Sequence, residues 1–545
     1  MFFNNILNKF LIFNKIIKHN NYYFKHENNS QTDDSKILVE FNNFTSNHVG
    51  TSYLANELKK IYKSKLIAYF GHVLLTYPLE RNLIFKIKLF LGKLFSINFF
   101  GTYKSFGVEN FFYPKYSSSL ENKKNKIYKD FLHNVKTLKK FEKFKINNIL
   151  VGDLMYDTYL KKNYDIIPTI DLSDKKFKKF IKDFISLFLI WENYFNKNKV
   201  KAVITSHTVY TLAIPLRIAV HRGIEAFCLA PEFLRRIKKN SLYLHNEIHF
   251  LKKIFNKIDI KKKQIIIKKS SEKIANRIKG LYSSDYPYVT KSAFGQTSKK
   301  NYIHKSNKIK FLIATHDFVD GPHSMGNHLF PDFYQWFKFL CKVSEKTNYF
   351  WYVKTHPNFG GDWTKYIKYE REVVKKTIKK YKNITLLPKN ITHNQIAREG
   401  INAVFTVHGT VGLDYALLKI PTINASLNNP HINYKFNYHP KSIRELESFI
   451  FNFKKKTKNY KVNNREILEY YSMKNIFFSK DWLFQDFDKT LKEVGGYHEV
   501  WKLEFYNYWI KMISKEKHHK ISKDIRKFIN SKNHNLLNNN NLGTF

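Results

Sequence analysis

INAVFTVHGTVGLDYALLKIPTI, residues 401–423, places two apolar runs on either side of a sharp turn and a short helix. The run at 403–407 is typical of a buried strand, and the β-branched run at 420–423 is typical of a second one. The turn lies at 408–410, where a histidine and a threonine flank a glycine. Two strands joined by a helix run in the same direction, so this stretch predicts a parallel sheet and an α/β fold.

The same alternation extends outward through the second half of the chain. Short runs rich in Val, Ile and Phe predict strands, and longer amphipathic runs predict helices. The expected strands are 308–317, 348–357 and 383–388, and the expected helices are 329–347 and 393–400.

A similar block comes earlier in the chain. Its expected strands are 36–41, 65–71, 201–207 and 224–231; its expected helices are 49–63, 177–195 and 208–223; and 146–160 is a strand that runs into a loop or helix. Two blocks of this kind predict two separate sheets.

Chain length supports the same division, because 545 residues exceed what one ordinary core holds. We expect an α/β fold of two Rossmann-like domains with a cleft between them, followed by helical C-terminal segments. The predicted parts are a basic aromatic extension (1–35), a first Rossmann-like domain (36–235), a connecting region (236–307), a second Rossmann-like domain (308–440), C-terminal helices (441–513) and a basic disordered tail (514–545).

The formal charge of +50 comes mainly from lysine, since only 11 of the 94 basic residues are arginine. Asn, Ile, Lys, Phe and Tyr are abundant together, which is typical of AT-rich codon usage. A charge this large still attracts polyanions such as anionic lipid, nucleic acid or an anionic substrate. No RRM, KH or zinc-finger signature occurs, so we expect no specific nucleic-acid partner.

Cysteine usage and hydropathy bear on location. Cys228 and Cys341 cannot form a disulfide framework or a CxxC metal site, which favours a reducing compartment. No run reaches the roughly 18 uncharged apolar residues of a membrane span. The basic aromatic segments 1–24 and 83–106 predict docking on an anionic membrane surface, with core packing as the alternative for 83–106. We therefore expect a cytoplasmic protein, peripheral at the inner face of the cytoplasmic membrane.

Polar side chains gather at the ends of three expected strands of the second domain. One strand ends at His316 and Asp317, the next carries Lys354 and His356, and the opening stretch leads to His408. In open parallel sheets, ligands bind beyond the carboxyl ends of the strands. Three histidines at equivalent positions therefore predict a functional site there.

The turn after the first run predicts an anion site. Gly409 and Gly412 allow a ligand to approach the backbone, and the helix that follows presents free N–H groups. Thr410 either caps this helix or binds a phosphate oxygen. Asp414, one turn later, either accepts ribose hydroxyls or balances the helix dipole.

This combination resembles the donor half of GT-B glycosyltransferases, especially bacterial capsule and surface-polysaccharide enzymes and the CDP-glycerol glycerophosphotransferases. The motifs that carry the resemblance are VKTHPN (353–358) and HGTVGLDYALLKIPTI (408–423). Further similar pieces are VGDLMYDTYL (151–160), SHTVYTLAIPLRIAVHRGI (206–224) and THDFVDGPHSMGNHLFPDFYQW (315–336). Many relatives carry Glu where Asp414 stands.

The resemblance implies a glycosyltransferase that moves a sugar from a nucleotide-activated donor to a glycan or lipid-linked acceptor of surface-polysaccharide assembly. It implies metal-independent catalysis without a cofactor, in which helix N–H groups and cationic side chains stabilise the leaving diphosphate. The donor-binding residues would be Lys354, His356, His408, Gly409, Thr410, Gly412 and Asp414.

An acceptor hydroxyl also needs a general base. The catalytic candidates are Asp153, Asp157, His207, His316, Asp317 and His356, with Asp320 as a further alternative. For the first-domain candidates, a structural role such as a helix cap is the competing interpretation. The loop 316–328, with Gly321, Gly326 and several histidines, is expected to close over the donor as a mobile segment.

Other interpretations remain open at this point. The chain can be a CDP-alditol phosphotransferase in which His356 and His408 act at phosphorus, or a sugar-nucleotide epimerase that needs no acceptor. It can also be a non-specific nucleic-acid binder or a non-catalytic scaffold. Arg217, Arg222, Arg235 and Arg236 either meet an anionic partner or lie on a solvated surface.

Overall fold

The computed structural model describes residues 2–24, 33–71, 87, 90–92, 94–95, 98–115, 117–244, 251–281, 292–295, 297–356, 364–477, 481–484 and 486–536. The chain forms two compact units. The first comprises Met1–Thr158, Leu172–Leu242 and Ser479–Phe545, and the second comprises Tyr159–Asp171 and Tyr243–Phe478. Each unit contains a mainly parallel sheet between helices, which confirms the α/β class expected from the alternating pattern.

The first unit is built on a six-stranded sheet in the order β3-β2-β1-β6-β7-β8, of which only β8 is antiparallel to its neighbour. Its strands are β1 (Asp33–Phe41), β2 (Ser64–Phe70), β3 (Val108–Phe112), β6 (Val200–Thr205), β7 (Glu225–Ala230) and β8 (Phe233–Arg236). The central strands are continuous apolar runs because both of their faces are buried.

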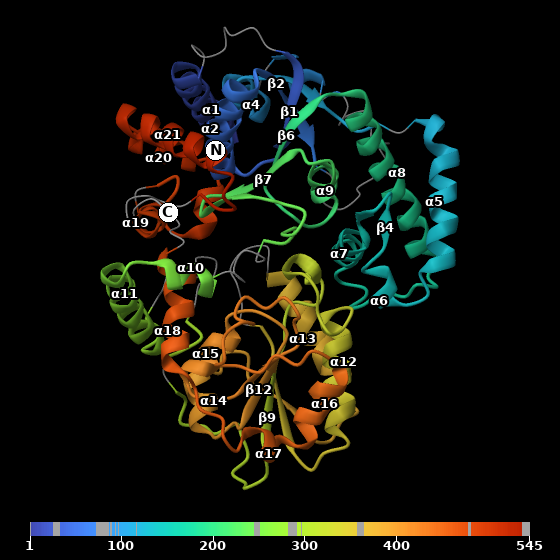
Figure 1. Ribbon diagram of the computed structural model, residues 1–545, viewed down its shortest axis with the longest axis vertical. Coiled ribbons are helices and arrows are strands. Elements are labelled where there is room, and N and C mark those ends of the chain that lie inside the picture. The colour runs from blue at the N-terminus through green and yellow to red at the C-terminus, as the bar shows by residue number, and fades with distance from the viewer. Residues whose placement is uncertain are drawn as a thin grey trace. The chain divides into compact units, whose positions relative to one another are not determined.

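Helices cover both faces of this sheet (Figure 1). Those on one side include α1 (Phe2–Phe24), α2 (Thr45–Tyr62), α4 (Phe99–Ser105), α20 (Phe505–Met512) and α21 (Lys515–Ser531). Those on the other side include α8 (Lys175–Lys197) and α9 (Ile214–His221). This unit also contains α5 (Glu121–Asn134), α6 (Leu138–Phe141), the hairpin β4 (Lys145–Ile146) and β5 (Ile149–Leu150) and α19 (Phe487–Val494). Helix α7 (Gly152–Lys162) begins in this unit, and its residues from Tyr159 belong to the second unit.

Helices α1 and α21 complete the core of this unit, which corrects the predicted disordered tail from 514. Ile12 and Ile16 of α1 and Ile525 and Phe528 of α21 are buried in one apolar cluster with the sheet. The prediction of disorder from 514 is therefore wrong for the residues of α21. The apolar residues of this helix recur every three or four positions. The high Lys and Asn content obscured this stripe.

The second unit contains a five-stranded parallel sheet in the order β11-β10-β9-β12-β13. Its strands are β9 (Lys310–Ala314), β10 (Phe350–Lys354), β11 (Ile384–Leu386), β12 (Ala403–Thr406) and β13 (Thr422–Asn424). Figure 1 shows α14 (His393–Arg398) and α15 (Val411–Leu417) on one side of the sheet, with α12 (Phe333–Ser344), α13 (Thr364–Ile378) and α16 (Ile443–Phe451) on the other. The unit also contains α10 (Leu251–Lys257), α11 (Ile260–Ile278), α17 (Phe453–Thr457) and α18 (Asn464–Ser472).

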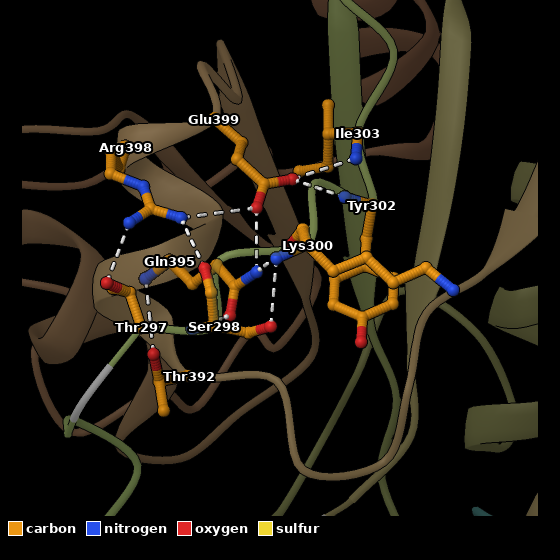
Figure 2. A network of polar contacts seen from close by, with 9 residues as sticks. All are labelled: Thr297, Ser298, Lys300, Tyr302, Ile303, Thr392, Gln395, Arg398 and Glu399. Carbon is orange, nitrogen blue, oxygen red and sulfur yellow. Dashed lines mark hydrogen bonds and ion pairs between the residues drawn. The ribbon is translucent and has the colours of Figure 1, made fainter.

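The expected connecting region 236–307 is not a separate linker, because its described part from Tyr243 belongs to the second unit. Figure 2 shows how its last residues are fastened to α14. Glu399 accepts the backbone N–H groups of Tyr302 and Ile303, each at 2.8 Å, and the Gln395 amide donates to the backbone carbonyl of Lys300 at 2.9 Å. These bonds hold an otherwise irregular segment against the helix before β9 begins.

Candidate functional site

The carboxyl edge of the second sheet contains a topological switch point between β9 and β12. The chain proceeds from β9 to β10 and β11 on one side, and from β12 to β13 on the other. The connections leave these two neighbouring strands in opposite directions, and open α/β sheets bind their ligands beyond the carboxyl ends of the strands at such a point. The residues that follow β9 and β12 are therefore the first to consider as ligand contacts.

His316 and His408 meet at this switch point. The backbone N–H of His408 donates to Nε2 of His316 at 3.2 Å, and the Thr406 hydroxyl lies 2.9 Å from the same nitrogen. Burial, together with the neighbouring His356, lowers the pKa of His316 to about 3. His316 is therefore neutral, and its Nε2 lone pair is used to hold the turn after β12 rather than to accept a proton from a substrate.

The glycines of the opening stretch have two different roles. Gly409 has φ +96°, a left-handed conformation that other residues adopt only with strain, so it makes the turn possible. A Cβ at Gly412 would lie 2.7 Å from Nε2 of His431 and 2.8 Å from the Asn437 amide nitrogen. The absence of a side chain at Gly412 thus leaves room for His431 and Asn437, whereas the sequence predicted that it leaves room for a ligand.

Asp414 is fully buried and faces Arg277, a contact that the sequence did not reveal. Nε of Arg277 donates to one carboxylate oxygen of Asp414 at 2.9 Å, and the terminal nitrogen donates to the other at 3.1 Å. Burial raises the pKa of the Asp414 carboxyl, while Arg277 and the Thr410 hydroxyl oppose the shift. Both oxygens are committed to the guanidinium, so the predicted contact with a ribose is not favoured. The scarcity of arginine in the sequence is the one signal that could have drawn attention to Arg277.

Thr410 precedes α15 without capping it through its side chain. Its hydroxyl hydrogen bonds to the Asp414 carboxylate instead. The two residues, one turn apart as the sequence indicated, stabilise each other at the start of the helix.

Lys354 and Glu370 form a second buried polar feature beside the switch point. Lys354 ends β10 and is 6% exposed, and burial lowers its pKa to about 8 against the attraction of Glu370. The Glu370 carboxylate accepts the Thr315 hydroxyl and, at 3.4 Å, the His356 backbone N–H. Pro357 and Asn358 of the predicted motif lie outside the described residues.

Glu370 was missed because it belongs to α13, a helix that the sequence analysis did not predict. It lies between Ile367 and Val374 at helical spacing, and all three are buried. An acid within an apolar stripe is the signal that would have identified it.

Asp317 and Asp320 lie together at the beginning of the histidine-rich loop. Burial and the neighbouring Asp320 raise the pKa of Asp317 to about 7. Asp320 accepts from Lys161 at 2.5 Å, which is an ion pair within the second unit. Asp317 can therefore carry a proton near neutral pH.

The rest of this loop is packed rather than free to close. His323 and His328 are buried, and the ring of His328 donates to the backbone carbonyl of Pro322 at 2.7 Å. The side-chain amide of Asn428 donates a hydrogen bond to the backbone carbonyl of Met325 at 2.6 Å. The expected mobile lid is thus replaced by a segment fixed against the residues that follow β13.

The first-unit candidates differ from one another. Asp153 accepts from Arg217 at 2.7 Å in an ion pair in which both side chains are almost completely buried. Asp157 is 1% exposed on the same helix. His207, just after β6, is half-buried, and its Nδ1 lies 2.6 Å from the Ser206 hydroxyl. Of these three side chains, only that of His207 is partly exposed.

The carboxyl edge of the second sheet brings together most of the residues expected there, namely His316, Asp317, Lys354, His356, His408 and Gly409. Asp153, Asp157 and His207 belong to the other unit. Within the described parts of the chain, no group of three or more His, Cys, Asp or Glu side chains is suited to hold a metal ion.

Comparisons with known proteins give fold likenesses only. No family model matches the chain, and no curated protein matches it. A Thermosulfurimonas dismutans KpsC structure, a beta Kdo 2,4 transferase, has 10% identity and a TM-score of 0.32, covering 52% of this chain and 85% of its own. A Rickettsia africae glycosyltransferase has 11% identity and a TM-score of 0.25, and the match covers 92% of this chain and 100% of the Rickettsia chain.

A Methanocaldococcus jannaschii UDP-GlcNAc 2-epimerase, solved with UDP-GlcNAc and UDP, has 11% identity and a TM-score of 0.25, covering 80% of this chain and 97% of its own. The function is therefore inferred from the side chains described above.

Proposed function

We propose that the protein is a glycosyltransferase of the GT-B type that uses a nucleotide-activated sugar. The observation that carries this proposal is the meeting of His316, Thr406 and His408 at the β9/β12 switch point. The left-handed Gly409 keeps the turn free of a side chain, and Lys354 adds a buried cation at the neighbouring strand end. A diphosphate suits such a site because it is an anion that backbone N–H groups and cations can both bind.

In this proposal the donor sugar passes to a surface-polysaccharide acceptor without a metal ion. The leaving diphosphate is stabilised by Lys354 and His408, and the Glu370 carboxyl beside Lys354 adjusts the charge of that lysine. Asp414 contributes by holding Arg277 and Thr410 rather than by contacting the donor.

A thermal-shift screen with CMP, CDP, UDP, GDP and their sugar conjugates tests donor binding. One nucleotide is expected to raise Tm by roughly 5 °C when present at about 100 times its Kd, because it binds only the folded state. His408→Gln should abolish the shift. His304→Gln is the matched control, since His304 is an exposed histidine of the same unit that precedes β9. If no nucleotide shifts a well-folded sample, the nucleotide-sugar proposal fails.

Product analysis then separates the related reactions. Release of a nucleotide with the sugar on an acceptor supports the glycosyltransferase. Free CMP with a phosphodiester product would identify a CDP-alditol phosphotransferase instead. Conversion of the donor without any acceptor would identify an epimerase.

We also propose that the protein acts at the inner face of the cytoplasmic membrane, on a lipid-linked acceptor. Leu7, Phe10 and Leu11 of α1 are about half exposed, while Ile12 and Ile16 of the same helix face the core. Lys15 lies on the outer side with them. A second exposed apolar group consists of Ile87, Phe90, Leu91, Leu94 and Phe95. Among the described residues, no helix is long and apolar enough to span a bilayer.

Vesicle co-sedimentation tests this docking. Vesicles that contain anionic lipid are expected to bind the protein at least about tenfold better than neutral vesicles. Replacing Leu7, Phe10 and Leu11 with serine should abolish binding, because apolar insertion is lost. Ile260→Ser with Ile265→Ser is the control, since both are exposed on α11 of the other unit. Equal loss with either set would contradict docking through α1.

A further inference from the structure

The amino edge of the second sheet carries a hollow that the proposed donor site does not use. Its volume is about 490 Å³, within the range of roughly 300–1,000 Å³ that is typical of ligand pockets. Its walls come from the residues before β9 and β10 and from the junction of α16 and α17. Because β9 is five residues long, this edge lies roughly 17 Å from the switch point at the carboxyl edge. The hollow is therefore a second site rather than part of the first.

Aromatic packing fixes the walls of the hollow. The ring of Phe311 on β9 contacts Tyr349 at a centroid distance of 5.2 Å and Phe453 on α17 at 4.9 Å, both edge to face. Farther along α17, the backbone carbonyl of Lys456 accepts the Tyr438 hydroxyl at 3.0 Å. These contacts hold the start of β10 and the backbone of α17 in place. A ligand therefore meets a backbone that is already ordered, which lowers the entropy cost of binding.

The lining carries positive charge without a compensating acid. Among the described residues that line the hollow, none is Asp or Glu and three are lysines, namely Lys308, Lys454 and Lys455. All three are exposed. Within the described part of the chain, neither Lys454 nor Lys455 forms an ion pair, so a ligand does not have to displace a carboxylate from them. Three amines in one hollow favour a ligand with several negative groups.

The other polar groups of the lining are amides, which belong to Asn307, Asn348 and Asn452. The Asn348 side-chain oxygen accepts from Nζ of Lys308 at 2.7 Å, which leaves the amide hydrogens of Asn348 for a ligand. The Asn452 amide donates to the Ser448 backbone carbonyl at 3.1 Å, which leaves the Asn452 side-chain oxygen as an acceptor. Donors and acceptors side by side suit hydroxyl groups, because a hydroxyl both donates and accepts.

Amines, amides and one exposed aromatic ring together fit an acidic oligosaccharide. Its hydroxyls suit the amides, its negative groups suit the lysines, and the C–H face of a sugar ring suits the negative face of Phe451, which is 43% exposed. Single-stranded nucleic acid would instead require successive aromatic rings on which several bases stack. The other ring of the lining, Tyr349, is only partly exposed because it packs on Phe311.

We propose that this hollow binds a stretch of an acidic oligosaccharide, and that it thereby retains an acceptor glycan away from the reacting end. The retention of an acceptor rests on the proposed transferase function, whereas the binding of an acidic oligosaccharide does not. Retention raises the effective concentration of the reacting end without any new contact at the donor site.

The first measurement is the affinity of the full-length protein for two probes, an oligogalacturonate octamer and the neutral maltooctaose, by calorimetric titration. The acidic probe is expected to bind at least about tenfold more tightly, because only its carboxylates pair with the lysines. Lys454→Gln combined with Lys455→Gln should remove most of this difference. Lys268→Gln combined with Lys269→Gln is the matched control, since it removes two adjacent exposed lysines from α11 of the same unit.

A second variant tests the aromatic wall. Phe451→Ser should weaken the binding of the acidic probe by about fivefold, because the ring no longer covers the sugar face. Ile443→Ser is its control, since Ile443 is an exposed apolar residue at the other end of α16 and does not line the hollow. Equal effects of the two substitutions would contradict a contact with Phe451.

The transfer reaction tests the retention of the acceptor. The double variant Lys454→Gln with Lys455→Gln should raise KM for an acidic acceptor of several sugar units by about tenfold. Its kcat, its KM for a single-sugar acceptor and its nucleotide thermal shift should equal those of the wild type. Unchanged KM for the long acceptor would overturn retention.

The outcomes are distinguishable. Equal affinity for the two probes, or an equal loss in the α11 control, overturns the binding of an acidic oligosaccharide at the hollow. Tighter binding of a single-stranded thymidine decamer, lost in the α17 double variant, would identify a nucleic-acid groove instead. Loss of the nucleotide thermal shift in that variant would identify a nucleotide site. Absence of any nucleotide shift in the wild type overturns the transferase proposal, while selective binding of oligogalacturonate would still establish the glycan site.

Discussion

Asp153→Ala is expected to lower the free energy of unfolding by about 3–5 kcal/mol, because it leaves the Arg217 guanidinium buried without its carboxylate. Arg217 and Asp153 side chains are 1% and 3% exposed, and the pair is 2.7 Å apart. The measurement is urea unfolding at neutral pH. Asp130→Ala is the control, because Asp130 is exposed on α5 and its loss should cost no more than about 0.5 kcal/mol.

A paired replacement sharpens this test. Asp153→Leu combined with Arg217→Met removes both charges and is expected to recover most of the lost stability, since neither group is left unpaired. The sequence offered Asp153 as a general base. An Asp153→Ala protein of unchanged stability but without transferase activity would contradict the structural role and restore that earlier interpretation.

Glu370→Gln is expected to remove a pH-dependent loss of stability. In the wild type, the free energy of unfolding should fall as the pH rises from about 4.5 to about 8. Burial raises the pKa of Glu370 from 4.5 to about 8 in the folded protein. Between these values the folded state binds a proton that the unfolded chain has released, so the free energy of unfolding falls as pH rises. The total change is on the order of 4 kcal/mol.

The measurement is the urea midpoint against pH for both proteins. Glu372→Gln is the matched control, because Glu372 lies two residues away on α13 and its side chain is 58% exposed. The control should follow the wild type above pH 5. If Glu370→Gln also follows the wild type throughout this range, Glu370 is not protonated in the folded protein.

The alternation of strands and helices was predictable because burial imposes it locally. The runs ending at His316, Lys354 and His408 are apolar since both faces of a central parallel strand are covered. The turn at Gly409 was predictable for a similar reason, because its left-handed backbone favours glycine. Each of these features depends on neighbours within a few residues.

Elements with mixed composition were harder to predict. The sequence missed α13 and treated α21 as disordered because lysines interrupt their apolar stripes. Lysine can bury its methylene chain and keep its amine in water, so such stripes are weaker in the sequence than in the packed helix.

The partners of the candidate residues depended on contacts between distant segments. Arg277 meets Asp414 across 137 positions, and Arg217 meets Asp153 across 64. Both acids were given possible functional roles from their local positions. Only the packing of separate helices showed that each of these carboxylates is paired with a guanidinium.

The sequence by itself determined the α/β class, the strand ends at which ligands would bind, and the residue types available there, because these follow from local periodicity and backbone sterics. Only the tertiary structure decided which ionisable groups are paired and which remain exposed to a substrate. It left the His207 ring partly exposed, while it buried Asp153 and Asp414 against arginines. The physical reason is that the cost of burying a charge is met by a partner, and in this chain that partner comes from a distant segment.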